Sequence, residues 1–132
     1  MTQDQVCEVI VGLGGKEYPD ARMSGGTRCF YMKRLVGVAK CGLNDRAPSI
    51  HVITHADFED TYNNQRFDGG VEFTVSGQAG GGRWMKALIY GVSRDEVQGL
   101  MPTIEATAAA VWSAFVASLA HEDKATASNN GD

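Results

Sequence analysis

The stretch SRDEVQGLMPTIEATAAAVWSAFVASLA, residues 93 to 120, is the segment whose apolar residues recur at the spacing of an α-helix. Ser93 and Glu96 have the form of a capping box, in which a hydroxyl and a carboxylate bond to free amides of the first turn. This pattern predicts a helix that begins at residue 93. Pro102 lacks an amide hydrogen and its ring crowds the preceding turn, so we expect a kink or a short break there.

The helical segment after Pro102 has one face of large side chains and one face of small ones. The large face carries Ile104, Ala108, Val111, Trp112, Phe115, Val116 and Leu119. The small face carries Thr103, Ala106, Thr107, Ala110, Ser113, Ala114 and Ala117. We expect the large face to cover a sheet, whereas the small face either meets water or lets a second helix approach closely.

The residues before this segment alternate or run apolar in ways that predict β-strands. The predicted strands cover residues 5–12, 27–41 (one bent strand or two, with Gly37 a possible bulge), 49–55, 71–77 and 83–92. The last of these is apolar on both alternations after Lys86, which predicts a central strand. Glycines at 12–16 predict a hairpin turn and those at 78–82 a flexible loop. The polar segment 56–70 predicts a hairpin loop, with the next strand beginning near Arg66 or Phe67.

These elements predict an α+β fold in which an antiparallel sheet of five to six strands is followed by C-terminal helices. Residues 1–132 form a single domain, with the sheet in 1–92, the helical segment in 93–121 and a polar tail in 122–132. One helix is narrow for such a sheet, so we expect a second subunit to supply part of the cover and the chain to be an obligate homodimer. We expect the dimer interface to contain Ile104, Val111, Trp112, Phe115 and Leu119.

Composition is that of an ordinary soluble domain, with 43% hydrophobic residues in 132. The three cysteines are odd in number and lack a CxxC pair, which favours reduced thiols over a disulfide framework or a zinc site. The N-terminus has no basic region followed by a long apolar run, and residues 101–120 contain Pro102, Glu105 and several hydroxyls. We therefore expect a cytoplasmic protein with no membrane span and no cofactor.

The net charge of −4 disfavours a nucleic-acid partner, but the charge is unevenly placed. Residues 21–56 carry six Arg or Lys against Asp45 alone, which is 6 minus 1, or +5. Most of the acids lie in residues 57–72 and in the helical end and tail. A locally basic sheet can still hold phosphate. A solvated surface of mixed charge is an equally good interpretation.

The best metal candidate is the group His51, His55, Asp57 and Glu59. Two histidines four apart on a strand lie about 13 Å apart, at roughly 3.3 Å per residue, which is too far to share an ion without a turn. The same distance argues against an acid–base pair, and no nucleophile signature surrounds them. We expect surface histidines, no metal and no enzyme.

Trp84 and Lys86 lie two apart at the start of the last predicted strand, so they point to the same face. An indole can stack on an unpaired base while an ammonium group meets phosphate. A core tryptophan beside a lysine at the sheet edge is the alternative that residue types alone leave open.

The order of these elements, with RWMKALIYGV followed by SRDE at 93–96, resembles the coat proteins of single-stranded RNA bacteriophages (levivirus-like). The chain length, the spacing from EVIVG to HVITH and the glycine loop at 78–82 also match that layout. In that family an aromatic residue and a polar residue two positions later help to hold an RNA hairpin, and Trp84 and Lys86 occupy a similar place.

The resemblance implies a structural coat protein that forms an intertwined dimer, assembles into an icosahedral shell and binds genomic RNA on the inner sheet face. It implies a location in the virion, and in the host cytoplasm during assembly. With the basic balance of 21–56, it predicts that RNA contacts Lys33, Lys40, His51, His55, Thr74, Trp84 and Lys86. The alternatives are a phage tail or assembly module that forms rings without RNA, and a small α+β ligand-binding or enzyme domain.

Overall fold

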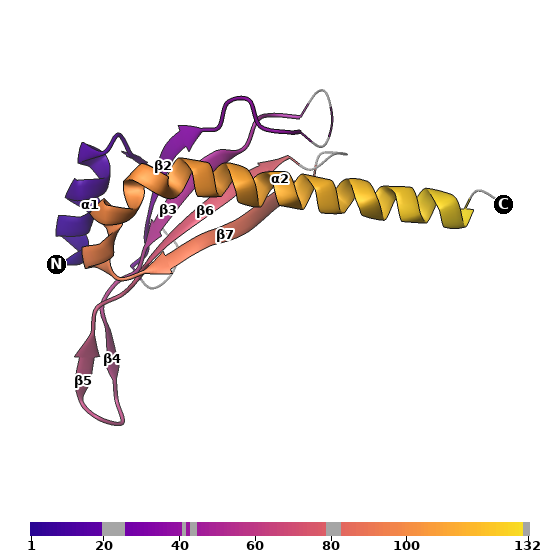
Figure 1. Ribbon diagram of the computed structural model, residues 1–132. Coiled ribbons are helices and arrows are strands. Elements are labelled where there is room, and N and C mark those ends of the chain that lie inside the picture. Colours follow the sequence, from indigo (N-terminus) through magenta and orange to yellow (C-terminus); the bar gives the residue numbers. More distant parts are fainter. Residues whose placement is uncertain (20–25, 41, 43–44, 79–82, 131–132) are drawn as a thin grey trace.

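The computed structural model describes residues 1–19, 26–40, 42, 45–78 and 83–130, of which 120–130 are described as helical backbone only. Its centre is a five-stranded antiparallel sheet with strand order β1-β2-β3-β6-β7. The strands are β1 (Lys16–Glu17), β2 (Arg28–Arg34), β3 (Ser49–Thr54), β6 (Val71–Gln78) and β7 (Trp84–Val92). A C-terminal helix follows, so the predicted α+β class and order of sheet and helix are confirmed (Figure 1).

The first predicted strand is wrong, because these residues form helix α1 (Gln3–Gly12). Thr2 and Gln5 make a capping box: the Thr2 hydroxyl accepts from the Gln5 amide at 3.1 Å, and the Gln5 side chain accepts from the Thr2 amide at 2.8 Å. Val6 and Ile10, one turn apart, are both buried. The following glycines end this helix, with Gly14 at a φ of 101°, and do not form the predicted hairpin turn.

Both helices lie on one face of the sheet (Figure 1). Helix α2 (Val97–Asn130) packs on β6 and β7, while α1 packs on β3. The two helices thus divide the cover that a single helix could not provide. The argument for a dimer from an under-covered sheet fails, because α1 supplies the missing cover.

The core lies between this covered face and the two helices. Fully buried residues of the sheet include Phe30, Ile50, Val52, Val71, Phe73 and Val75. Trp112 of α2 is 1% exposed, and its indole Nε1 donates to the carbonyl of Ala39 at 3.0 Å. A Cβ on Gly77 would come within 3.1 Å of the Trp112 ring, so glycine there lets the indole lie directly on β6. Trp112 therefore fastens α2 to both the sheet and the loop after β2.

The helical segment begins where the sequence predicts, but through different contacts. Ser93 is the N-cap of the short 3₁₀ helix η1 (Arg94–Glu96), and its hydroxyl makes no capping bond in this part of the structure. The amide of Glu96 donates instead to the Ser93 carbonyl at 3.2 Å. Pro102 lies inside α2, which is continuous, so the predicted break is wrong. Figure 1 shows the first turns of α2 inclined to the rest, in line with the predicted kink.

Three further strand predictions need correction. Gly37 is not a bulge: it lies in the loop after β2 with a φ of 75°, and the irregular register falls between Tyr31 and Lys33. Strand β7 is at an edge of the sheet, not at its centre. The segment 56–70 holds its own two-stranded ribbon, β4 (Phe58–Asp60) paired with β5 (Gln65–Phe67). Loop 78–82 falls largely outside the described residues.

We expect Trp112→Ala to lower the free energy of unfolding by about 3–5 kcal/mol, because it leaves a large cavity and an unpaired carbonyl at Ala39. Urea unfolding followed by circular dichroism measures the change. The control is Ser113→Ala, an exposed neighbour, which should change stability by less than about 0.5 kcal/mol. Equal stability of the two variants would show that α2 does not pack through Trp112.

Candidate nucleic-acid interface

The sheet face that the helices leave uncovered is called here the open face. Strand register places Trp84 opposite Gln78, Lys86 opposite Ser76 and Leu88 opposite Thr74. The residues between them, such as Ala87, face the helices with Val75. Trp84 and Lys86 therefore share the open face, and the Trp84 ring is 61% exposed, so it is not a core residue of the single chain.

The middle of the open face is a row of residues that crosses three strands. Thr74 of β6 lies opposite His51 of β3, which lies opposite Tyr31 of β2. Thr74 was predicted to contact RNA, and it is on the correct face but only 2% exposed. The accessible surface of this row therefore comes from the side chains on either side of Thr74, those of His51 and Leu88.

His51 is held between two tyrosines. Its ring stacks on Tyr18 with centroids 5.8 Å apart, and Tyr31 meets it edge-on at 5.7 Å. The Tyr18 hydroxyl lies 3.1 Å from His51 Nδ1. Burial lowers the pKa of His51, and the positive charge of Lys86 lowers it further. A neutral imidazole between two phenols forms an aromatic platform rather than a cation for phosphate.

His55 lies apart from this platform, just after the end of β3. Its Nε2 is 3.3 Å from a carboxylate oxygen of Glu72. Asp57 in turn is paired with Arg94 at 2.6 Å. Three members of the predicted metal group, His51, His55 and Asp57, thus have different partners, and within the described ranges no three such ligands converge.

Two predicted RNA contacts lie elsewhere. Lys33 is directed to the covered face, where its ammonium group meets Glu105 of α2 at 2.9 Å. The cause is the register shift between Tyr31 and Lys33, which reverses the alternation that would have placed Lys33 on the open face. Lys40 is exposed in the loop after β2, away from the strands of the open face.

Two of the six cations in residues 21–56, Arg28 and Lys33, lie on the covered face, where acids neutralise them. Arg28 pairs with Asp4 at 2.8 Å and with Glu17 at 2.7 Å. Arg22 lies outside the described residues. The open face gains instead Arg34, which is exposed and opposite Ser49. Sequence alternation could not find Arg34, because it lies beyond the bulge.

Two aromatic residues and one leucine of the open face were also missed. Tyr18, Tyr31 and Leu88 complete a surface in which apolar side chains alternate with basic ones. A signal for Tyr31 was present, since it lies two residues after Cys29 in a clear strand pattern. Tyr18 follows a two-residue strand that is too short to recognise.

The predicted dimer residues divide into two groups. Ile104 and Trp112 are 3% and 1% exposed within the single chain, so its own core already uses them and they are corrected to core residues. Val111 and Phe115 pack at the margin of this core and stay partly accessible, as does Leu119 farther along α2. Only the second group is available to a second subunit.

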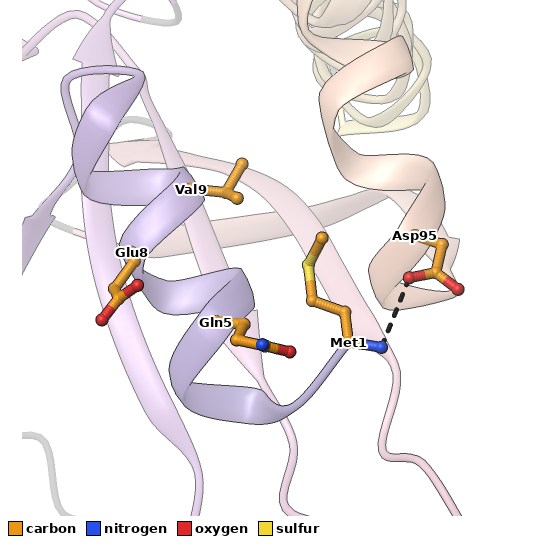
Figure 2. Close-up of a pocket in the computed structure, with 5 residues that line it drawn as sticks. All are labelled: Met1, Gln5, Glu8, Val9 and Asp95. Atoms are coloured by element: carbon orange, nitrogen blue, oxygen red, sulfur yellow. Dashed lines mark ion pairs between the residues drawn. The ribbon is translucent and has the colours of Figure 1, made fainter.

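One groove lies where α1 meets η1 (Figure 2). It is lined by Met1, Gln5, Glu8, Val9 and Asp95. The amino group of Met1 is 3.5 Å from Asp95, while Glu8 points away on the far side of α1. These polar groups do not converge on a common point, so the groove has none of the arrangement that catalysis requires.

Among the described residues, one helical span, Arg94–Leu119, is long and apolar enough to cross a membrane by length and composition. Ile104, Ala108 and Trp112 of this span are buried against the chain's own sheet. Core helices pass the same test, so the span is weak evidence for a membrane segment.

Comparison of the chain with protein-family models, with curated proteins and with solved structures gave no match.

We expect Lys86→Met to raise the pKa of His51 toward its ordinary value of 6.5, because the neighbouring positive charge is removed. The pKa should stay below that value, since burial is the larger cause. NMR titration of the imidazole proton shifts measures it. Lys33→Met removes the same charge on the covered face and should leave His51 unchanged. An unaltered His51 pKa in Lys86→Met would mean that the Lys86 ammonium group does not lie over the platform.

Proposed function

We propose that this chain is a shell-forming coat protein that dimerises through β7 and α2 and binds single-stranded RNA on the open face. The observation that carries the proposal is on β7: its outer edge has no partner strand among the described residues, while its open face presents Trp84 and Lys86 side by side. The choice of a coat protein, among proteins that assemble and bind RNA, comes from the likeness in sequence layout to coat proteins of single-stranded RNA bacteriophages.

The edge of β7 is suited to pairing with a second chain. It is nine residues long and contains no proline or inward-pointing charge, which are two of the devices that block edge-to-edge association. Lys86 points to the open face, and the register irregularity of β7 lies after Leu88. Leu88 on its open face is 59% exposed. Antiparallel pairing of β7 with its copy would satisfy the free backbone groups and join the two sheets into one.

Helix α2 supplies a second argument for a dimer, because it continues well past the edge of the sheet (Figure 1). Only 17% of its most apolar 18-residue window is buried in the single chain. Phe115 and Leu119 follow the buried Trp112 along α2 and stay partly exposed. A second copy joined at β7 would place a sheet and a helix where these side chains can be covered.

The charge of the open face supports RNA despite the negative total. By strand register this face carries Lys16, Arg34 and Lys86 against Glu72 alone, which is 3 minus 1, or +2. Glu72 is itself beside His55. Exposed Trp84 next to a lysine is the arrangement by which proteins stack unpaired bases and hold their phosphates. Asp4 of α1 and Glu105 of α2 lie on the other side of the sheet, paired with Arg28 and Lys33.

We expect the purified chain to sediment as a dimer at micromolar concentration and to form closed, RNA-containing particles under electron microscopy. Leu119→Asp should weaken the dimer by about tenfold or more, because it places a charge in the apolar contact. The control is Ser118→Asp, which adds the same charge on an exposed neighbour. A stable monomer would contradict the proposal, and rings without nucleic-acid absorbance would favour the assembly-module alternative.

We expect Trp84→Ala to cost about 1–3 kcal/mol of affinity for an RNA hairpin, with little change in salt dependence, because it removes a stacking contact. Lys86→Ala should weaken hairpin and unstructured RNA alike and reduce the salt slope by about one phosphate contact. Filter binding of purified dimers across a salt series separates the two effects.

The control for the RNA experiment is Lys33→Ala, which removes a lysine on the covered face and should leave RNA affinity unchanged. Equal RNA affinity of Trp84→Ala, Lys86→Ala and the unchanged chain would exclude the open face as the RNA site.

A further inference from the structure

The two-stranded ribbon β4–β5 projects from one end of the sheet, away from both helices (Figure 1). Phe58 and Phe67 stack across it with ring centroids 5.3 Å apart, yet their side chains stay 57% and 39% exposed. Tyr62 at its turn is 96% exposed. Three exposed aromatic side chains on one short projection form an apolar patch that water covers poorly.

The base of the ribbon is fixed to the domain. Arg94, which is 3% exposed, donates to the carbonyl of His55 at 2.9 Å and pairs with Asp57 at 2.6 Å and Asp68 at 3.8 Å. Arg66 adds a bond to Asp57 at 3.2 Å. Two strands alone are marginally stable in water. The ribbon is therefore held in place at its base but lacks a packing partner along its length.

The ribbon is also acidic. Residues 57–68 contain Asp57, Glu59, Asp60 and Asp68 against Arg66, which is 1 minus 4, or −3. Asp57 is committed to Arg94 and Arg66, so the charge available to a partner comes chiefly from Glu59, Asp60 and Asp68. A partner for this element should thus be basic and should offer an apolar contact.

The opposite end of the same sheet has both properties. Strand β3 runs from the basic loop at its start to the ribbon at its end, so the two surfaces lie at opposite ends of one strand. The loop carries Val36, which is 87% exposed, and the exposed cations Lys40 and Arg46, with Arg34 at the adjoining end of β2. Against these three cations stands Asp45, so residues 34–48 carry 3 minus 1, or +2. A chain cannot bring these two ends of its own sheet together.

We infer that the β4–β5 ribbon of one copy docks on the basic end of a second copy, with Tyr62 against Val36 and Glu59 toward Lys40. The binding partner of the ribbon is therefore a second copy of this chain. The inference rests on the proposed self-assembly, but not on RNA binding.

A contact between two different ends of the same chain is head-to-tail, so it propagates from copy to copy. It differs in kind from the two-fold pairing proposed for β7 and α2, which is complete in a dimer. A chain that has both kinds of contact can close a shell: the first builds dimers and the second links them.

Cross-linking between two marked copies tests the contact. Tyr62→Cys and Val36→Cys change two highly exposed side chains, so both variants should fold. Both variants also carry Cys41→Ser, because the native thiol next to Lys40 in the sequence could react in place of the introduced one. In an equimolar mixture of the two purified chains, a short bifunctional thiol reagent should give cross-linked pairs. Neither variant alone, nor Tyr62→Cys mixed with Val11→Cys on α1, should give them. Cross-linking of Tyr62→Cys with itself would overturn the head-to-tail arrangement.

Charge reversal gives an independent test. Glu59→Lys or Lys40→Glu alone should raise the protein concentration needed for assembly roughly tenfold, because attraction becomes repulsion. A single chain that carries both changes should assemble at a concentration within about threefold of that needed by the unchanged chain, because the ion pair is restored with its signs exchanged. Glu8→Lys on α1 makes the same charge change elsewhere and should assemble normally.

The outcomes separate the two proposals. Normal assembly of Glu59→Lys, or failure of the double variant to recover, would overturn the ribbon contact and leave the coat function standing. An unchanged chain that stays a dimer at every concentration would overturn both.

Discussion

The buried guanidinium of Arg94 is the interaction on which the arrangement of the chain depends. It lies where the sheet ends and the helical segment begins, and it bonds to the carbonyls of Met1 and His55 and to the carboxylate of Asp57. Through these partners it joins the start of α1, the end of β3, the ribbon and η1. A charge buried this deeply is tolerated only when its partners are all present, so the four elements can take their places only together. The bond to Arg94 also holds the pKa of Asp57 below its ordinary value, with Arg66 adding to the effect.

Sequence patterns located the sheet and the long helix, because β3 and β6 alternate, β7 is a nearly continuous apolar run, and α2 repeats every three to four residues over many turns. They failed at the N-terminus, where residues 5–12 fit both periods. Thr2 and Gln5 mark the start of α1, where they form a capping box. Ser93 and Glu96 are residues of the same kind at the same spacing, but they form no capping box. The difference lies in tertiary context, since Arg94 and the sheet end already fix the backbone at residue 93.

The residues of the candidate site could be predicted only where side chains alternate regularly between the two faces of the sheet. Trp84 and Lys86 were placed on one face correctly because no irregularity lies between them, while one bulge in β2 sent Lys33 to the helices and brought Arg34 to the open face. The local charge of +5 in residues 21–56 also overstated the positive charge of the open face. A local charge sum does not reveal which cations meet acids across the fold, as Arg28 and Lys33 do.

The division of charge follows from the one-sided cover of the sheet. Helices carry the acids that neutralise Arg28 and Lys33 on the covered face, so the chain can be negative overall while its open face stays basic. The same division leaves the sheet with two unfinished boundaries, the β7 edge and the aromatic ribbon, at places that one chain cannot close by itself. A protein that acted alone would expose both to aggregation. In the proposed assembly of many copies the two boundaries would become the contacts between copies, and the uncovered basic face would remain available to a polyanion.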